Sequence, residues 1–272
     1  MGKSLSRILI RIKRSFRRAL HDYSNHRKVD FLVCGAQKAG TSALASYLEE
    51  HPEICMADAK ELHFFDNEDV FLRGAPDYNS YHSAFNPRAS HKLWGEATPI
   101  YMYWYTAPRR MWEYNPELKL IVILRNPIAR AYSHWNMQRS RGIERLSFWE
   151  AIQQEKQRCR EALPYQHRLY SYVDRGFYSE QLRRLWTYFP QEQVLVLRTE
   201  DLRNSPLELL TNIWTFLGLN PHDEIVPRQV HSRPYISPMG KREKEYLVNL
   251  YEYEIRNLER LLGWDCSEWL IP

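Results

Sequence analysis

The chain has 272 residues, of which 44% are hydrophobic and 26% are charged, and its formal net charge is +5. These proportions fit one large globular domain and exclude collagen-like and low-complexity chains. Four widely spaced cysteines argue against a zinc site or a disulfide scaffold and favour reduced thiols. The sequence has no N-glycosylation sequon, and no apolar run approaches the roughly 18 residues of a membrane span, so we expect a cytoplasmic protein.

The positive charge is concentrated in the first 30 residues, which carry nine Lys or Arg against two Asp. Apolar residues recur there at helical spacing among the arginines, at Leu5, Leu9, Ile12, Phe16 and Leu20. We interpret residues 1–29 as a basic amphipathic arm and residues 30–272 as the globular domain. The arm has the character of a helix peripheral to a membrane, of a transit peptide, or of an ordinary helix packed on the domain, and the sequence leaves these alternatives open. A nucleic-acid partner is not expected.

Short apolar runs alternate with segments of helical periodicity along the rest of the chain. Residues 31–34 predict a strand, and the segment after Gly40 predicts a helix that His51-Pro52 ends. Strands at 118–124 and 194–197 are each followed by a predicted helix, at 127–141 and 206–217, and a long helix is predicted at 241–262. The aromatic segment 94–114 fits neither period. Nearly continuous apolar strands are typical of an α/β fold in which a central parallel sheet is flanked by helices and binds ligands at the carboxyl ends of its strands.

The first predicted strand runs into a loop bounded by glycines, and a helix with hydroxyl residues at its start follows. Backbone N–H groups and the positive end of the helix converge on an anion in such an arrangement. The loop is not a Walker A sequence, because Lys38 comes two residues before Gly40. The strand at 118–124 also ends in Arg125, where a magnesium-dependent kinase usually carries an acidic residue. We therefore predict an anion site that uses protein cations and needs no metal, formed by Gly35, Ala36, Gln37, Lys38, Ala39, Gly40, Thr41 and Ser42.

A second motif accompanies the loop. Arg125 ends a predicted strand and Ser133 lies eight residues later on the next helix, and a planar guanidinium with a hydroxyl makes a compact phosphate clamp. The two motifs together resemble those of the sulfotransferases that use the donor 3'-phosphoadenosine 5'-phosphosulfate (PAPS), especially the heparan-sulfate type and related bacterial enzymes. The resemblance implies a P-loop-like three-layer sandwich, with residues 35–42 around the 5'-phosphosulfate and Arg125 and Ser133 around the 3'-phosphate. It also implies that Lys38 stabilises the departing phosphate.

Residues 60–66, KELHFFD, resemble the Glu-x-His-Phe-Phe segment of the heparan-type enzymes, in which the Glu is the catalytic base. The resemblance makes Glu61 the predicted base, with His63 as the alternative base or as a residue that orients Glu61 or the sulfonate. An acceptor hydroxyl must lose its proton as it attacks sulfur, and we expect Phe64 and Phe65 to raise the pKa of Glu61 for this task. The alternative is an aromatic strand of the core, with Glu61 in a structural ion pair.

Residues 95–101 resemble a further family segment in which a Lys often precedes the Thr-Pro pair. Ala97 stands at that position, which argues against highly anionic acceptors and leaves Glu96 and Thr98 as the predicted acceptor-side residues. The resemblance also suggests that Tyr178 contacts the donor. Three cations near the C-terminus are candidates for covering the 3'-phosphate, with ordinary surface charge as the alternative. They are Arg233, Lys241 and Arg242.

We expect a PAPS-dependent sulfotransferase that transfers sulfonate to a hydroxyl, less readily an amine, of a glycan, glycolipid or secondary metabolite. Numerous Trp and Tyr residues favour a sugar acceptor, although such residues more often belong to a core. Two other classes remain open at this stage. A magnesium-dependent small-molecule kinase would prefer ATP to 3'-phosphoadenosine 5'-phosphate (PAP). A catalytically idle nucleotide-binding adaptor would depend on its N-terminal arm.

Overall fold

The structure of the protein is a computed structural model that describes residues 27–72, 74–222, 225 and 235–271. Residues 1–26 of the predicted arm and the candidate donor residue Arg233 lie outside the described residues.

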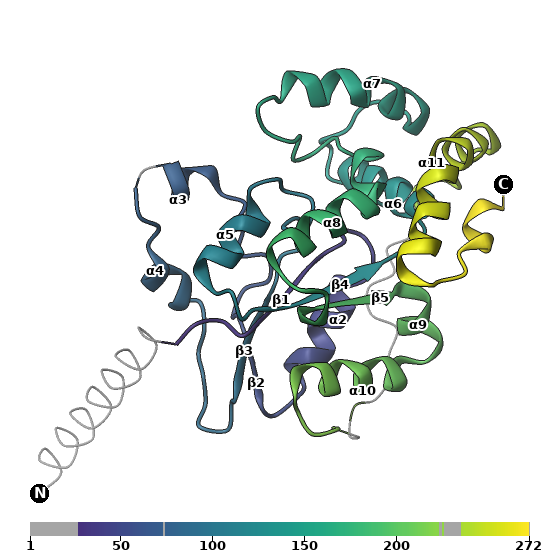
Figure 1. Ribbon diagram of the computed structural model, residues 1–272. Coiled ribbons are helices and arrows are strands. Elements are labelled where there is room, and N and C mark those ends of the chain that lie inside the picture. The colour runs from purple at the N-terminus through teal and green to yellow at the C-terminus, as the bar shows by residue number, and fades with distance from the viewer. Residues whose placement is uncertain (1–26, 73, 223–224, 226–234, 272) are drawn as a thin grey trace, which may run out of the picture.

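The described residues contain one sheet of five parallel strands, in the order β2-β3-β1-β4-β5 (Figure 1). The strands are β1 (Phe31–Gly35), β2 (Ile54–Met56), β3 (Leu93–Ala97), β4 (Lys119–Leu124) and β5 (Val194–Arg198). Val33 of β1 pairs with Ala97 on one side and with Ile121 on the other, so β1 is the central strand. Every residue of β1 is buried, as a continuous apolar run in a covered parallel sheet should be. The α/β fold with a parallel sheet is therefore confirmed, while β2 and β3 were not predicted.

Helices lie on both faces of the sheet (Figure 1). They are α2 (Thr41–Glu49), α3 (Glu68–Leu72), α4 (Tyr78–His82), α5 (Ala107–Tyr114), α6 (Pro127–Ser140), α7 (Phe148–Glu161), α8 (Tyr178–Tyr188), α9 (Thr199–Asn204), α10 (Pro206–Leu217) and α11 (Lys241–Leu262), with the 3-10 turns η1 (Asp174–Gly176), η2 (Gln191–Gln193) and η3 (Ser267–Leu270). The helices predicted at 127–141, 206–217 and 241–262 are confirmed almost to the residue. Local capping explains this precision at α6, where the Asn126 side chain accepts hydrogen bonds from the backbone N–H groups of Ile128 and Ala129.

An aromatic cluster fills much of the core beside β3. The rings of Phe64 and Tyr81 stack with centroids 4.5 Å apart, and Phe85 stacks on Trp94 at 5.2 Å. Of the tryptophans considered as sugar platforms, Trp94, Trp104 and Trp135 are buried, whereas Trp112 is exposed. Most of these rings therefore stabilise the fold and do not present a surface to a ligand.

The order of the strands in the sheet places the loop after β1 at a position where α/β proteins commonly bind ligands. β1 and β4 are neighbours, although β2 and β3 come between them in sequence and lie on the other side of β1. Such a reversal opens a crevice at the carboxyl ends of the two strands. The backbone N–H of Ala36 donates to the carbonyl of Ile123, 2.8 Å away, and the Thr199 hydroxyl lies 2.5 Å from the carbonyl oxygen of Ala39. The loop is thus tied to β4 and α9 beside this crevice.

Candidate active site

Residues 35–42 form a tight loop that requires glycine at both ends. A Cβ at Gly35 would lie 2.6 Å from the sulfur of Met102, and Gly40 has φ +101°, a conformation that side chains rarely adopt. Gly40 is also the N-terminal cap of α2, and it supplies no side-chain hydrogen bond to the first turn. The N–H groups at the start of α2 are therefore suited to meeting an anion.

Arg125 is brought to the loop from the end of β4. Its Nη1 donates to the carbonyl oxygen of Lys38 at 3.3 Å, and its Nη2 donates to the Tyr235 hydroxyl at 3.1 Å. Tyr178 is fully buried, and its hydroxyl donates to the backbone carbonyl of Arg125 at 2.9 Å. The structure thus makes Tyr178 a support for Arg125, and a direct contact of its side chain with the donor stays a prediction. Ser133 is partly buried on α6, on the helix that Arg125 precedes.

Two arginines that the sequence analysis did not single out hold the same loop. Arg130 of α6 and Arg175 of η1 are both buried. Arg130 donates to the carbonyl of Gln37 at 3.5 Å, and Arg175 donates to the Gln37 side-chain oxygen at 2.6 Å. The available signal was weak, because cations in a predicted helix or turn are usually interpreted as surface charge.

Glu61 and His63 belong to a charged cluster next to the end of β3. The backbone N–H of Glu61 donates to the carbonyl of Ala97 at 3.1 Å. The Glu61 carboxylate lies 2.6 Å from the Lys60 Nζ and 3.7 Å from the Nε2 of His63, whose Nδ1 lies 3.0 Å from Asp66. The four side chains thus form a continuous chain of opposite charges.

Arg168 completes this cluster by donating to both the carboxylate and the backbone carbonyl of Asp66. The hydrogen bond that His63 donates to the Asp66 carboxylate raises the pKa of His63, although burial works in the opposite direction. Burial by itself would raise the pKa of Asp66, but hydrogen bonds from His63 and Arg168 hold that pKa below its usual range. His63 therefore tends toward its protonated form, which suits orienting Glu61 or the sulfonate better than accepting a proton.

The aromatic residues beside Glu61 do not enclose its carboxylate as we expected. Phe65 is fully buried and Phe64 nearly so, and both rings pack against Tyr81 in the core. The Glu61 side chain is 34% exposed and pairs with Lys60. The ion-pair alternative is thus present in the structure, and the role of Glu61 as base stays a prediction.

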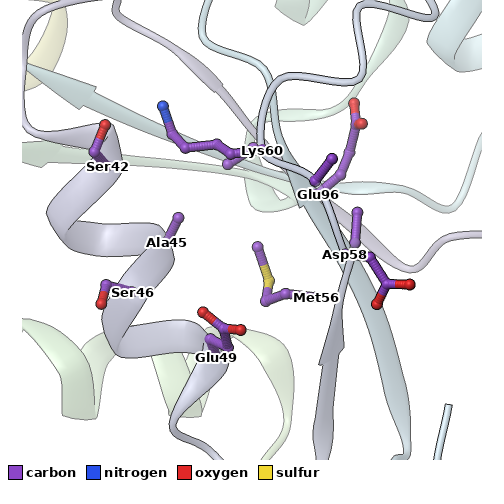
Figure 2. A pocket seen from close by; sticks show the side chains of 11 residues that line it. Ser42, Ala45, Ser46, Glu49, Met56, Asp58, Lys60 and Glu96 are labelled. Carbon is purple, nitrogen blue, oxygen red and sulfur yellow. The ribbon is translucent and has the colours of Figure 1, made fainter. Parts of the chain in front are cut away.

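Glu96 is a buried carboxyl group, and neither of its carboxylate oxygens has a hydrogen-bond partner within the described residues. Burial raises its pKa to about 8, and the charge of Asp66 adds to this effect, while the hydroxyls of Tyr101 and Thr98 oppose it. The carboxyl group turns away from α2 (Figure 2). Thr98 is also fully buried. Contact of either side chain with an acceptor stays a prediction.

The two described cations proposed to cover the 3'-phosphate lie at the start of α11. Lys241 is largely exposed and lies 3.6 Å from Glu245. The guanidinium of Arg242 lies over the ring of Trp149, 3.7 Å from its centroid. These contacts are typical of surface charge, and a donor contact by either residue stays a prediction.

A cavity of about 200 Å³ adjoins the donor loop between α2, the segment after β2 and the end of β3. Figure 2 shows Lys60 extending toward Ser42 at its upper edge, with Glu49 at its lower edge. Its remaining walls are formed by Ala45, Ser46, Met56, Ala57, Asp58, Ala59, Glu96 and Ala97. Since Ser42 belongs to the loop and Lys60 pairs with Glu61, the cavity opens beside both parts of the predicted site.

In the described part of the chain, no three His, Cys, Asp or Glu side chains are grouped closely enough to hold a metal ion. The same residues include no helix with the length and apolar character needed to cross a bilayer. All four cysteines are free thiols.

A parallel sheet with a glycine-bounded cationic loop at its reversal point defines an α/β protein that binds an anionic nucleotide-like ligand. The chain belongs to the sulfotransferase domain family, which matches residues 28–244. It is similar to a solved sulfotransferase from Alicyclobacillus acidocaldarius, with a TM-score of 0.77 and 29% identity over 89% of this chain and 99% of the other.

Curated relatives include further sulfotransferases. The membrane-associated sulfotransferase kil1 of Dictyostelium discoideum is 24% identical over 87% of this chain and 65% of its own length. Human heparan sulfate glucosamine 3-O-sulfotransferase 6 is 33% identical over 69% of this chain and 52% of its own length. The chain therefore spans less than two thirds of either relative. Membership of this family confirms the predicted resemblance and the class of transferase enzymes, and it favours sulfonate transfer over the kinase alternative.

Proposed function

We propose that the protein transfers a sulfonate group from PAPS to a hydroxyl, less readily to an amine, of a small-molecule or glycan acceptor. The observation that carries this proposal is the convergence of Arg125 and the Lys38 loop on the start of α2. PAPS is anionic at both its 5' and 3' positions, and the glycine-bounded loop offers backbone N–H groups and cations to such charge. The residues present therefore fit the donor.

PAPS supplies an activated sulfonate, whose bond to the 5'-phosphate breaks as its sulfur bonds to the acceptor oxygen, leaving PAP. Lys38 then stabilises the negative charge on the departing phosphate. Glu61 accepts the proton of the attacking hydroxyl, and the protonated His63 beside it orients its carboxylate. Lys60 holds the Glu61 carboxylate in place through their 2.6 Å ion pair.

The cavity beside the loop favours a small hydroxylated acceptor group with little negative charge. Its volume of about 200 Å³ lies below the roughly 300–1,000 Å³ of pockets for drug-sized ligands, which suits a single ring. Glu49 and Asp58 contribute negative charge to its walls, while the positive charge of Lys60 is offset by Glu61. Two serines, Ser42 and Ser46, offer hydroxyl groups there. A neutral sugar or hydroxylated metabolite thus fits better than a heparan-like polyanion.

We further infer a cytoplasmic location in which the N-terminal arm contacts a membrane surface. The basic amphipathic pattern of the arm supports this, and one relative is membrane-associated.

The donor assignment is tested by calorimetry with PAP and with ATP in the presence of a chelator. We expect the protein to bind PAP without metal and in preference to ATP, and to transfer radiolabelled sulfonate from PAPS to a member of a hydroxylated acceptor panel. Lys38→Ala should abolish transfer. Preferential ATP binding would restore the kinase alternative, and PAP binding without transfer to any acceptor would support the idle adaptor.

The base assignment is tested with Glu61→Gln, which keeps the shape of the side chain and removes its charge. We expect kcat to fall about 100-fold or more, because a general base typically accelerates a reaction by at least this factor, while PAP affinity is retained. The exposed Glu117→Gln is the matched control and should leave both quantities unchanged. Full activity in Glu61→Gln would exclude Glu61 as the base.

A further inference from the structure

Two buried arginines lie behind the donor loop and form no ion pair with any residue that the structure describes. Arg130 has no solvent exposure, and Arg175 is 2% exposed. The hydrogen bonds that their guanidinium groups make within the described residues go to neutral oxygens, namely those of Gln37, His167, Arg168, Ser171 and Tyr172. The Nε of Arg130 has no partner there. Burying unpaired charge is costly, so the pair requires an explanation beyond the stability of the free protein.

Both guanidinium groups meet at Gln37. Arg130 Nη1 lies 3.5 Å from the backbone oxygen of Gln37, and Arg175 Nη1 lies 2.6 Å from its side-chain Oε1. A guanidinium only donates hydrogen bonds, so it fixes the amide with its oxygen toward Arg175 and its NH₂ group directed elsewhere. Gln37 immediately precedes Lys38, whose φ of 74° is unusual for a residue with a side chain. The two arginines thus fix the part of the loop that carries Lys38.

The titratable groups around the arginines do not cancel their charge. Glu155 is buried, and its carboxylate accepts hydrogen bonds from the backbone N–H groups of Val173 and Asp174. Burial raises the pKa of Glu155 to about 7, so it is only partly ionised at neutral pH. Burial and the charges of Arg175, Arg130 and Lys38 lower the pKa of His134 well below its usual value, so this histidine stays neutral. The charge of Asp174 also acts on Arg175, but its carboxylate accepts a hydrogen bond from the Tyr103 hydroxyl at 2.7 Å and makes no ion pair with either arginine within the described residues. With Lys38 nearby as a third cation, positive charge exceeds negative charge next to the loop.

We propose that Arg130 and Arg175 are positioning residues for the donor, which fix Gln37 in the loop and hold buried positive charge that the anionic 5' end of the donor balances on binding. The inference rests on the proposed function, because it concerns the site assigned to PAPS. It predicts that a substitution which neutralises this buried charge stabilises the free protein and weakens its binding of the donor. A negative charge placed on the protein at position 37 should supply the missing partner and compete with the donor.

Gln37→Glu tests this opposition with almost no change in shape. We expect the melting temperature of the free variant to rise, because the introduced carboxylate pairs with Arg175, and PAP affinity in calorimetry to fall about tenfold or more. The matched control is Gln191→Glu in η2, just before β5 at the other end of the sheet, which should change neither quantity. If the wild-type protein does not bind PAP, the proposed function fails. If it binds PAP and Gln37→Glu binds equally well, only this inference fails.

A loss of PAP affinity in Gln37→Glu could also come from repulsion between the new carboxylate and the anionic ligand. A double-mutant cycle with variants that add no negative charge distinguishes the two causes. Gln37→Ala and Arg175→Lys each break the contact between the two side chains without adding negative charge, and Arg175→Lys retains the buried cation. We expect each to weaken PAP binding about tenfold, and the double variant to bind no more weakly than the weaker single variant. Additive losses in PAP affinity, or unchanged affinity in Arg175→Lys, would overturn the proposal.

Discussion

Lys38, Glu61 and His63 share a backbone conformation that residues with side chains seldom adopt. Their φ angles are 74°, 63° and 53°, and all three are residues that the sequence assigns to the chemistry of sulfonate transfer. A left-handed conformation costs a residue other than glycine on the order of 1–3 kcal/mol and persists only where surrounding contacts impose it. At Glu61 this contact is the hydrogen bond from its N–H to the carbonyl of Ala97. At Lys38 it is the hydrogen bond that its carbonyl accepts from Arg125. The strain thus coincides with the predicted site.

The raised pKa of His63 depends first on Asp66, so Asp66→Asn should lower it. The amide of Asn cannot stabilise the imidazolium by charge, and the pKa is expected to fall toward the ordinary value of about 6.5. An NMR titration of the His63 ring measures the change. Asp265→Asn on the surface is the control and should leave the ring unaffected. An unchanged pKa in Asp66→Asn would show that another group holds the proton.

Glu96 makes the stability of the protein depend on pH. Its pKa is raised to about 8 in the folded protein, so the folded state keeps the proton while the unfolded chain releases it above its ordinary pKa near 4.5. This contribution to stability is fully present below about pH 4.5 and is lost as pH rises toward 8. Glu96→Gln does not ionise, so its stability relative to the wild type should increase over that window by up to a few kcal/mol.

Thermal melting at several pH values tests the role of Glu96. The difference in melting temperature between Glu96→Gln and the wild type should widen from pH 5 to pH 8 and then remain constant. A difference that does not vary with pH would mean that Glu96 is ionised in the folded protein.

At the scale of elements, β3 packs against β1 only because position 95 lacks a side chain. A Cβ at Gly95 would lie 2.1 Å from the ring of Phe31. Gly95→Ala should therefore force β1 and β3 apart and lower the free energy of unfolding by about 1–3 kcal/mol or more, the usual range for overpacking. Gly142→Ala is a control with open space around it, although its positive φ carries a cost of its own of about 1 kcal/mol. The free energies of unfolding are measured by urea denaturation. A larger loss in Gly142→Ala than in Gly95→Ala would contradict the claim that β1 and β3 require glycine at position 95.

The elements that sequence predicted correctly are those with a strong local signal, even where, as in β5, they are only partly buried. β1 and β4 are continuous apolar runs, and α6 and α10 carry a proline in the first turn. β3 was missed because it contains Gly95 and the buried Glu96 between Trp94 and Ala97, and this pattern has neither helical nor strand periodicity. β2 has only three residues. Such strands are specified by their neighbours in the sheet and not by their own composition.

At the scale of the whole molecule, the predicted donor loop and Arg125 meet because β1 and β4 are adjacent. Sequence alone supplied both motifs, but it did not supply Arg130 and Arg175, which lie 93 and 138 residues away from Gln37 in the chain. It gave burial of Phe64 and Phe65 in the core only as the alternative to their enclosing the Glu61 carboxylate. Contacts of such long range depend on packing among several elements, which local periodicity does not encode.

The C-terminal helix α11 belongs to the same unit, although all of it after residue 244 lies beyond the residues that the family matches. The Tyr251 hydroxyl donates to the carbonyl of Val173 at 2.5 Å, directly before the turn that carries Arg175. Glu254 accepts hydrogen bonds from the backbone N–H and the hydroxyl of Ser179, both at 2.7 Å. These contacts connect α11 to α8 and η1, and through Arg175 to the donor loop.

Val29, the last residue of the predicted arm, makes contacts with the domain that bear on the boundary predicted at residue 30. Val29 is buried, its N–H donates to the Tyr114 hydroxyl at 2.7 Å, and its carbonyl accepts from Asn115 at 2.9 Å. Asp30 adds a side-chain hydrogen bond from the backbone N–H of Trp94 at 2.7 Å. The backbone N–H of Asp30 also donates to the carbonyl of Trp94 at 2.9 Å, and the Asp30 carbonyl accepts from the N–H of Lys119 at 3.0 Å. A chain that starts at Arg27 keeps these contacts, whereas a chain that starts at Phe31 loses all five hydrogen bonds.

Two truncated proteins therefore separate the arm from the domain. Residues 27–272 should melt close to the full chain and bind PAP with the same affinity in calorimetry. Residues 31–272 lose about 5 kcal/mol at about 1 kcal/mol per hydrogen bond, which corresponds to a melting temperature lower by roughly 10–20 °C. If residues 27–272 fail to fold or bind PAP more weakly than the full chain, the arm is part of the folded domain. Equal melting of the two truncated proteins would place the boundary at residue 31, because the contacts of Val29 and Asp30 would then contribute nothing measurable.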